Sequence, residues 1–558
     1  MAETENTKTD LVFVPLGGVG EIGMNFALYG FGPPSNREWI AIDCGVTFPD
    51  PTLPGVDLVL PDTSFIETYR DRLRGMIITH AHEDHYGALV DTWPRLGCPV
   101  WMTPFTAGLL EAKRMGEPGA PKIPIKIYEG GDRFEIGPFA IEAVPVAHSI
   151  PEPMSLAITT PLGTVVHTGD WRIDTAPEIG PPTDEARFRA LGDAGVDALI
   201  CDSTNAMREG TSPSEQAVGQ GLREVIAKAK GRVAITTFSS NVGRIRSIAE
   251  AARDTGRQML VMGRSLKRVI DVATDLGYMK DLPEFVAEED FGYIPRENLV
   301  ILCTGSQGEP RAALAKLSRD EFRSVQLAKG DTVVFSSRVI PGNEKGILAI
   351  KNALIDRGIR VVEDGDALVH VSGHPRRDEL RQMYAWTRPK TAVPVHGEAA
   401  HLAAHAELAR ECGVPDVASI RDGAMLRLLP GPSKVLDEVP VGRLYKDGMI
   451  VGDEKAIGVI DRRKLSFAGH VAVNVVLDDR YELAGEPDIV AIGVASTSRD
   501  GESIEELMLD AAIEAFDSIP KGRRKDLDLV SEAVRRAVRN AANDAWGKKP
   551  LVTVFVTR

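Results

Sequence analysis

The chain has 558 residues, a formal net charge of −15 and 43% hydrophobic residues. At roughly 150 residues per domain, this length suggests three or four folding units, and the composition excludes disorder as the main state. No apolar run approaches the roughly 18 residues that a membrane span needs, and residues 1–10 lack the apolar segment of a signal peptide. We therefore expect no membrane partner and a cytoplasmic location.

The five cysteines are far apart and never form a C-x-x-C pair. This spacing argues against a disulfide framework and against a zinc site made of thiolates.

Short apolar runs separated by Gly/Pro turns dominate the first 200 residues and predict strands at 11–16, 39–42, 75–79, 139–146, 164–167 and 198–201. From about residue 214, helical patterns alternate with single buried strands at 232–237, 258–262, 299–303 and 332–336, which predicts a separate parallel α/β layer. The apolar run 391–395 again has the pattern of the strands in the first 200 residues. A stretch rich in Gly, Pro and Asp, 431–453, is expected to be a linker.

The last part of the chain reads as two strands, two helices and a final strand at 551–556. In the second helix, apolar residues at spacings of three and four predict one buried face made of Leu527, Val530, Val534, Val538 and Ala541. The final strand would place Val552, Val554 and Val556 on one face and could leave an open sheet edge.

A glycine-rich segment at 18–23 matches the dinucleotide pattern G-x-G-x-x-G. That pattern needs a helix directly after it, whose N-terminus binds the pyrophosphate. Residues 24–29 read as another strand instead, so we interpret the segment as a tight hairpin.

The strongest chemical signal is H-A-H-E-D-H at 80–85, directly after a predicted strand. On an extended strand end His80 and His82 share a face, and the turn into a helix would direct Asp84 and His85 towards a second cation. Imidazole and carboxylate ligands suit zinc or manganese. A plain surface cluster is a poor explanation, because three of only 11 histidines lie here.

Three more candidates follow predicted strands: His148, Asp170 and Asp43. A carboxylate that bridges two cations is the natural role for Asp170. Asp43 fits a partner that orients a ligand imidazole, although an Asp that stabilises a turn stays open.

These motifs, in this order, resemble the metallo-β-lactamase fold: H-A-H-E-D-H, then His148, then H-T-G-D at 167–170. The segments C-D-S-T at 201–204, S-G-H at 372–374 and P-V-H-G-E at 394–398 are similar to the three further motifs of the β-CASP nucleases. P-L-G-G-V-G-E-I-G-M-N at 15–25 and T-G-S-Q-G-E-P at 304–310 resemble ribonuclease J. The resemblance covers nearly the whole chain.

The resemblance implies an α/β protein: a metallo-β-lactamase αββα sandwich with an inserted parallel α/β β-CASP domain and a small C-terminal α+β domain. The expected bounds are 1–213 and 376–430 for the two parts of the metallo-β-lactamase domain, 214–375 for the insertion, 431–453 for the linker and 454–558 for the C-terminal domain.

The resemblance also implies two Zn²⁺ ions per subunit, with Mn²⁺ or Mg²⁺ as alternatives. His80, His82 and His148 would hold one ion, and Asp84, His85 and His396 the other, with Asp170 between them. His374 would contact the scissile phosphate, and Asp202 would support the site as a second carboxylate behind the ligands.

The distribution of charge along the sequence gives separate support for RNA binding. Residues 231–268 carry eight positive and two negative side chains in an otherwise acidic protein, which favours a phosphate backbone, although a solvated helix face is an alternative. Two polar loops after strands could also hold phosphates, or be ordinary polar loops. These loops are Ser239-Ser240-Asn241 and Gly305-Ser306-Gln307.

We therefore expect a zinc-dependent ribonuclease that degrades single-stranded RNA from 5′ to 3′, prefers 5′-monophosphate ends and also cuts internally. The resemblance places a pocket for the 5′ end at Ser239 to Asn241 and at the loop His370, Val371, Ser372, Gly373 and His374. It also implies a homodimer or homotetramer assembled through the C-terminal domain, and membership of an RNA-degradation complex.

Two other classes of function are alternatives to a ribonuclease. A small-molecule hydrolase on the same fold, such as a thioesterase or lactonase, would have no use for an insertion of this length. A non-catalytic RNA-binding component would not need the complete set of ligands.

Overall fold

The computed structural model describes residues 8–558, so the first seven residues of the polar amino-terminal stretch lie outside the described part. The chain forms two compact units: the segment up to Thr47 with Val59–Arg443, and Phe48–Leu58 with Leu444–Arg558. Among the described residues, no helix combines the length and apolarity that a membrane span requires.

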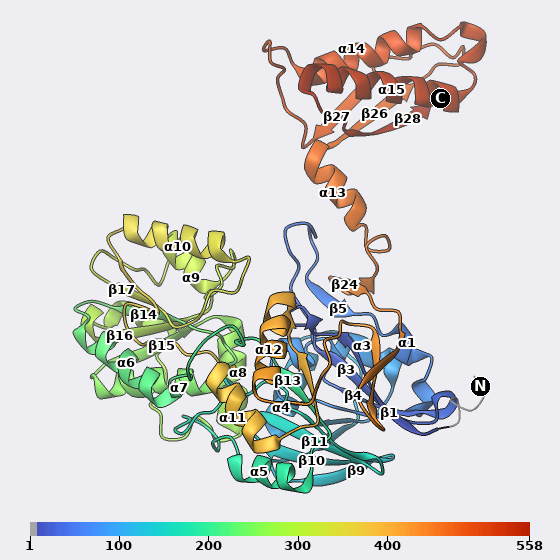
Figure 1. Cartoon of the computed structure of the whole chain (residues 1–558). Helices are drawn as coiled ribbons and strands as arrows, with labels where there is room; N and C mark the ends of the chain where they lie inside the picture. Colours follow the sequence, from blue (N-terminus) through green and yellow to red (C-terminus); the bar gives the residue numbers. More distant parts are fainter. Residues whose placement is uncertain (1–7) are drawn as a thin grey trace. The chain divides into compact units, whose positions relative to one another are not determined.

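Two mixed sheets form the centre of the first unit (Figure 1). The first contains, in spatial order, β23 (Lys434–Glu438), β22 (Ala424–Leu429), β1 (Asp10–Gly17), β3 (Phe26–Gly32), β4 (Glu38–Ile42), β6 (Leu73–Ile77), β7 (Val100–Met102) and β8 (Ile125–Ile127). The second contains β21 (Asp416–Val417), β19 (Thr391–Val395), β13 (Ala198–Asp202), β12 (Gly163–His167), β11 (Met154–Thr160), β10 (Phe139–Pro145) and β9 (Arg133–Ile136).

Apolar side chains of both sheets meet in one core, to which Phe13 and Ile40 contribute from one sheet and Ile158 and Ile200 from the other. Such residues alternate with others along each strand because successive side chains point to opposite faces. The helices beside the sheets are α1 (Ser64–Glu67), α2 (Glu83–Tyr86), α3 (Leu89–Leu96), α4 (Pro104–Met115), α5 (Glu185–Ala194), α11 (Arg377–Thr387) and α12 (Ala399–Glu411). This confirms the predicted αββα sandwich.

A separate five-stranded sheet is built from the middle of the chain, and all its strand pairs are parallel. Its order is β15 (Gln258–Met262), β16 (Leu299–Cys303), β14 (Val233–Thr236), β17 (Thr332–Phe335) and β18 (Arg360–Val362). Its helices are α6 (Glu215–Lys228), α7 (Val242–Asp254), α8 (Arg264–Asp275), α9 (Ala313–Ser318) and α10 (Glu344–Asp356). The chain leaves the sandwich after β13 and returns to it at β19, and these two strands are neighbours in the second sheet. The five-stranded sheet is therefore an insertion between two adjacent strands of the sandwich.

The glycine-rich segment 18–23 does not begin a helix, which agrees with our rejection of a dinucleotide site. It is, however, not a tight hairpin. β1 and β3 pair antiparallel, but between them Val19–Gly20 form β2, which pairs with β20 (Gly397–Glu398). The partner strand comes from far along the chain, so local sequence could not indicate it.

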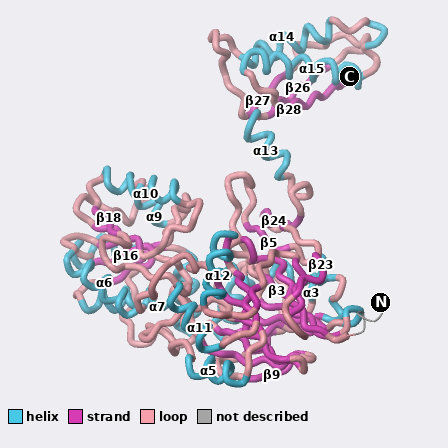
Figure 2. The backbone as a smooth tube through the Cα atoms, viewed as in Figure 1, coloured by secondary structure: helices cyan, strands magenta, loops and turns pink. Residues whose placement is uncertain are grey.

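The second unit contains α13 (Val459–Ala468) and a three-stranded sheet in the order β27 (Asp488–Ile492), β26 (His470–Val476), β28 (Leu551–Thr557). Figure 2 shows α14 (Ile504–Asp517) and α15 (Leu527–Trp546) on one face of this sheet. Among residues 8–558, β28 pairs only with β26, so it is an edge strand, as predicted.

Two predictions for this region need correction. The buried face of α15 consists of Val530, Val534, Val538 and Ala542, whereas Ala541 is half-buried and Leu527, the first residue of the helix, is 36% exposed. The stretch 431–453, expected as a linker, contains β23 and the hairpin of β24 (Arg443–Asp447) and β25 (Ile450–Gly452). The remaining short strand is β5 (Leu58–Pro61).

Candidate metal centre

The H-A-H-E-D-H segment follows β6 and runs into α2. His80 and His82 lie before the helix, and Asp84 and His85 lie on it. His148 follows β10, Asp170 follows β12 and His396 follows β19. All the strands concerned end at the same side of the sandwich, so the structure brings these seven predicted residues together.

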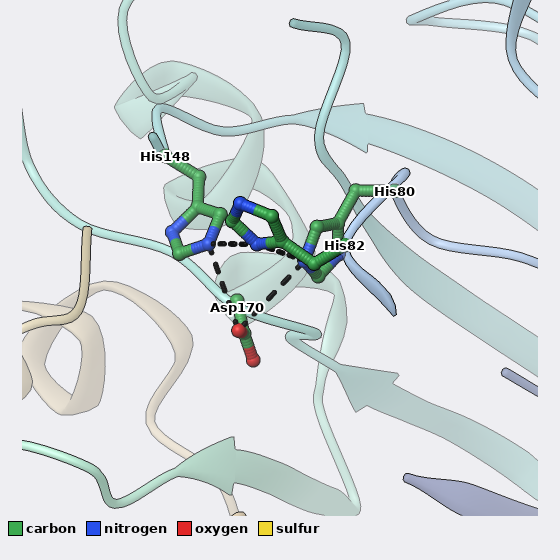
Figure 3. A group of neighbouring side chains, drawn as sticks. All are labelled: His80, His82, His148 and Asp170. Carbon is green, nitrogen blue, oxygen red and sulfur yellow. Dashed lines mark hydrogen bonds and ion pairs between the residues drawn. The ribbon is translucent and has the colours of Figure 1, made fainter. Parts of the chain in front are cut away.

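One group of potential ligands consists of His80, His82, His148 and Asp170 (Figure 3). His82 Nδ1 lies 3.0 Å from His80 Nε2 and 3.0 Å from His148 Nε2. Asp170 Oδ2 lies 3.8 Å from His80 Nε2 and 3.6 Å from His148 Nε2.

A second group consists of Asp84, His85, Asp170 and His396. His85 Nε2 lies 3.3 Å from Asp170 Oδ2, and His396 Nε2 lies 3.3 Å from Asp84 Oδ2. Asp170 belongs to both groups, which is the position that a bridging carboxylate requires.

His374 completes the cluster from the loop before α11. Its Nδ1 lies 2.7 Å from Asp202 Oδ2 and 3.8 Å from Asp170 Oδ2. The structure thus places His374 beside the potential ligands and Asp202 directly behind it.

Each of four imidazoles is oriented through its Nδ1 atom. His80 Nδ1 lies 3.0 Å from Thr79 Oγ1, and His85 Nδ1 lies 2.7 Å from Asp43 Oδ2. His148 Nδ1 lies 2.7 Å from the Gly373 carbonyl oxygen, and His396 Nδ1 lies 2.7 Å from Thr204 Oγ1. Such partners fix the ring of a ligand histidine and leave the other nitrogen for a metal. Asp43 also accepts hydrogen bonds from the backbone and side chain of Thr79, so it stabilises the turn as well as His85.

The two groups differ in protonation. Burial lowers the pKa of His82 to about 4 and holds the pKa values of His80 and His148 well below their ordinary range. Burial also disfavours charge on His396, but Asp170, Asp202 and Asp84 outweigh it and raise its pKa to about 10. The His80, His82 and His148 rings are therefore neutral, which is the form that binds metal.

The residues fit a metal ion on two grounds. His82 Nδ1 lies 3.0 Å from the Nε2 atoms of both His80 and His148, which gathers three potential ligand nitrogens around one point. Asp170 Oδ1 is buried and has no hydrogen-bond partner among the described residues. A buried carboxylate oxygen without a partner is costly, and a cation would compensate it.

The predicted RNA-binding loops have mixed outcomes. Asn241 caps α7, because its side-chain oxygen accepts from Arg244 N, and Gln307 uses both ends of its amide to hold the segment 338–343. The oxygen of each amide is thus engaged within the protein, so only the amide nitrogens are left as donors for a phosphate. His370 and Ser372 are half-buried beside the cluster, and Ser372 Oγ accepts from Asn205.

The basic stretch 231–268 is mostly structural, which corrects its interpretation as an RNA groove. Arg244 is fully buried and pairs with Glu215, and Arg257 donates to the backbone carbonyls of Ala229 and Gly231. Arg246 pairs with Glu250. Counting charge along a sequence cannot show that Arg244 has its partner in another segment, at Glu215.

Sequence reasoning missed Thr204, Asn205 and Arg338. Thr204 stands in the C-D-S-T motif, so its role could have been considered. Arg338 NH1 donates to Asn205 Oδ1 at 2.7 Å, and Asn205 donates to Ser372 Oγ and the His374 carbonyl. A single arginine after β17 carries no pattern that would have indicated this.

Comparisons with known proteins agree with the geometry. Four family models match: "Beta-lactamase superfamily domain" at 38–237, "Ribonuclease J, beta-CASP domain" at 230–354, "Zn-dependent metallo-hydrolase RNA specificity domain" at 358–417 and "Ribonuclease J C-terminal domain" at 457–558. A solved structure of a protein of unknown function from Enterococcus faecalis has a TM-score of 0.51 at 15% identity, covering 76% of this chain and all of that one. That likeness concerns the fold alone.

Fold and cluster together define a metal-dependent hydrolase of the metallo-β-lactamase superfamily with a β-CASP insertion. "Ribonuclease J" of Sinorhizobium meliloti is 62% identical over 98% of this chain and 97% of its own. "Ribonuclease J" of Mycolicibacterium smegmatis is 37% identical over 97% and 96%. The chain belongs to the ribonuclease J family and is a metal-dependent ribonuclease, as the sequence predicted.

Replacing Asp43 by Asn should weaken metal binding about 10- to 100-fold, because His85 loses the carboxylate that orients it. Metal affinity is measured by competition with a chromogenic chelator. Asp193→Asn, at a carboxylate that is 77% exposed, is the control and should change nothing. Unchanged affinity in Asp43→Asn would show that Asp43 serves only the turn.

Proposed function

We propose that this ribonuclease degrades single-stranded RNA from the 5′ end, prefers 5′-monophosphate ends and also cuts internally, in the maturation and decay of messenger and ribosomal RNA. The observation that carries the proposal is the position of the metal centre, which lies against the Ser372–His374 loop that joins the insertion to the sandwich. A small-molecule hydrolase would not need this loop.

We further propose that the centre holds two zinc ions. His80, His82 and His148 would hold one, Asp84, His85 and His396 the other, and Asp170 would bridge them. Bound there, the ions would supply activation of water at neutral pH and neutralise charge on the phosphate.

His374 would act on the scissile phosphate. Its Nδ1 is engaged by Asp202, so Nε2 is the atom left for substrate. Burial opposes its charge, but Asp202 and Asp170 raise the pKa of His374 above its ordinary value. A protonated imidazole can stabilise the phosphate or protonate the leaving oxygen, and both roles stay open.

Three arginines beside this loop support an anionic substrate. Among residues 8–558, Arg208, Arg338 and Arg376 have no carboxylate within ion-pair distance. Burial, and the charges of Arg208 and Arg376, lower the pKa of Arg338. Positive groups that repel one another are stabilised when a phosphate backbone lies between them.

Arg244 supports the proposed pocket for the 5′ end. Its backbone nitrogen donates to Asn241, and its guanidinium donates to the Val369 carbonyl. Arg244 thereby contacts both the loop 239–241 and the residue before the loop that begins at His370, so both loops can contribute to the pocket.

RNA with a 5′-monophosphate should be degraded to mononucleotides faster than the same RNA with a 5′-triphosphate, because a closed pocket cannot take the larger group. Internal fragments should appear from both, and a chelator should abolish all cleavage. Products are resolved on a denaturing gel. Equal rates on both ends would rule out the selective pocket, and mononucleotides without any internal fragments would rule out internal cutting.

His374→Ala should lower kcat about 10²- to 10⁴-fold while metal content and RNA affinity stay near wild type. Single-turnover kinetics and elemental analysis give these values, with His470→Ala in the second unit as control. Loss of metal together with activity would make His374 a ligand instead.

We also propose that the chain works in the cytoplasm as a homodimer or homotetramer, within an RNA-degradation complex. The open edge of β28, with Leu551 and Phe555 exposed, supports assembly through the C-terminal domain. Light scattering at micromolar concentration should give a dimer or tetramer, and a chain truncated after Asp453 should be monomeric. A monomeric full-length chain would contradict this proposal.

A further inference from the structure

A hollow of about 300 Å³ lies in the second unit, between the end of α13, the middle of α15 and the beginning of β28. Four of its lining residues are cationic: Lys464, Arg535, Arg539 and Lys549. No acidic residue lines it. The metal centre contributes nothing to this hollow, because all the proposed metal ligands belong to the first unit.

Composition does not explain this gathering of positive charge. From residue 454 to 558 the sequence has 18 acidic and 16 basic side chains, so the domain as a whole is slightly acidic. Arg535 is partly neutralised by Glu532, and Lys464 by Asp461 at 3.2 Å. Within the described chain, Arg539 and Lys549 have no carboxylate at ion-pair distance. Two of the four cations that line the hollow, Arg539 and Lys549, therefore have no ion-pair partner among residues 8–558.

An aromatic ring forms part of the wall. Phe467, at the end of α13, lines the hollow and is 67% exposed. Lys548 Nζ lies 4.5 Å from the centre of the Phe467 ring and 5.0 Å from that of Trp546, and it donates to the Phe467 carbonyl at 2.9 Å. The ring is thus held in place and remains open to a ligand.

We propose that this hollow is a second binding site for single-stranded RNA, separate from the metal centre. Phosphates would lie against Arg539 and Lys549, and a base would stack on Phe467. Each step of a single strand offers one base and one phosphate, and exposed rings among cations are the usual platform for such strands. The hollow has the size of a small-ligand site, so it fits one nucleotide of an extended strand better than the surface of a folded partner.

The test uses the full chain and a fluorescent 30-nucleotide oligouridine in the presence of a chelator, so that RNA binds without being cut. Arg539→Gln with Lys549→Gln should make the slope of log affinity against log salt less negative by about 1.4, which corresponds to two phosphate contacts on a single strand. Phe467→Ala should weaken binding about fivefold to a hundredfold, because a stacking platform is lost. Anisotropy measures both effects.

Arg536→Gln with Lys525→Gln is the matched control. It removes the same charges from the same unit, and neither side chain lines the hollow. The control should leave the slope unchanged. With metal restored, kcat/KM for a tetranucleotide should also be unchanged in every variant. This measurement separates a failure of the proposed second RNA site from a failure of the proposed cleavage mode.

Three results would overturn the proposal. The first is an unchanged slope in the hollow variant, and the second is an equal change in the control. The third is conversion of an oligomer to a monomer in light scattering at unchanged RNA affinity per subunit, which would make the hollow a contact between copies. Should the double variant fold poorly by circular dichroism, the exchange Arg539→Lys with Lys549→Arg keeps the charge and should keep the wild-type slope.

Discussion

The arrangement of the site depends on one buried carboxylate, Asp170. It is 3% exposed, and ring nitrogens of five histidines lie within 4 Å of it. A buried charge is costly unless positive groups surround it, and His396 and His85 hold the pKa of Asp170 well below its usual range despite its burial. Loops that follow β6, β10, β12 and β19 thus converge on a single side chain. Metal ligands drawn from separate loops need such a common centre.

The inserted domain takes part in building the centre. The Gly373 carbonyl orients His148, and a side chain at Gly373 would meet the His148 ring at 2.6 Å, so this position needs glycine. Glu152, four residues after His148, accepts from Tyr278 of the insertion and from the backbone nitrogen of Phe105. The potential metal ligands and the insertion are therefore positioned together by these hydrogen bonds.

The arginines of this acidic protein occupy two kinds of environment. Arg244 and Arg257 are buried and hold segments together, whereas half-buried Arg338 and exposed Arg539 have no carboxylate partner among residues 8–558. The chemical nature of the side chain is the same in both cases. What differs is whether another segment supplies a counter-charge, and that difference separates structural arginines from candidates for RNA contact.

The sequence by itself determined the fold class and the segments that form the candidate metal centre. Strand periodicity predicted β1, β4 and β13 closely, and the H-x-H-x-D-H spacing indicated His80 to His85, because residue spacing along a strand end or helix turn is a local property. Local sequence did not indicate β2, the partners of Arg244, or the place of Arg338 beside Asn205. These depend on pairing between segments more than a hundred residues apart or on packing, and only the tertiary structure decides which distant groups meet.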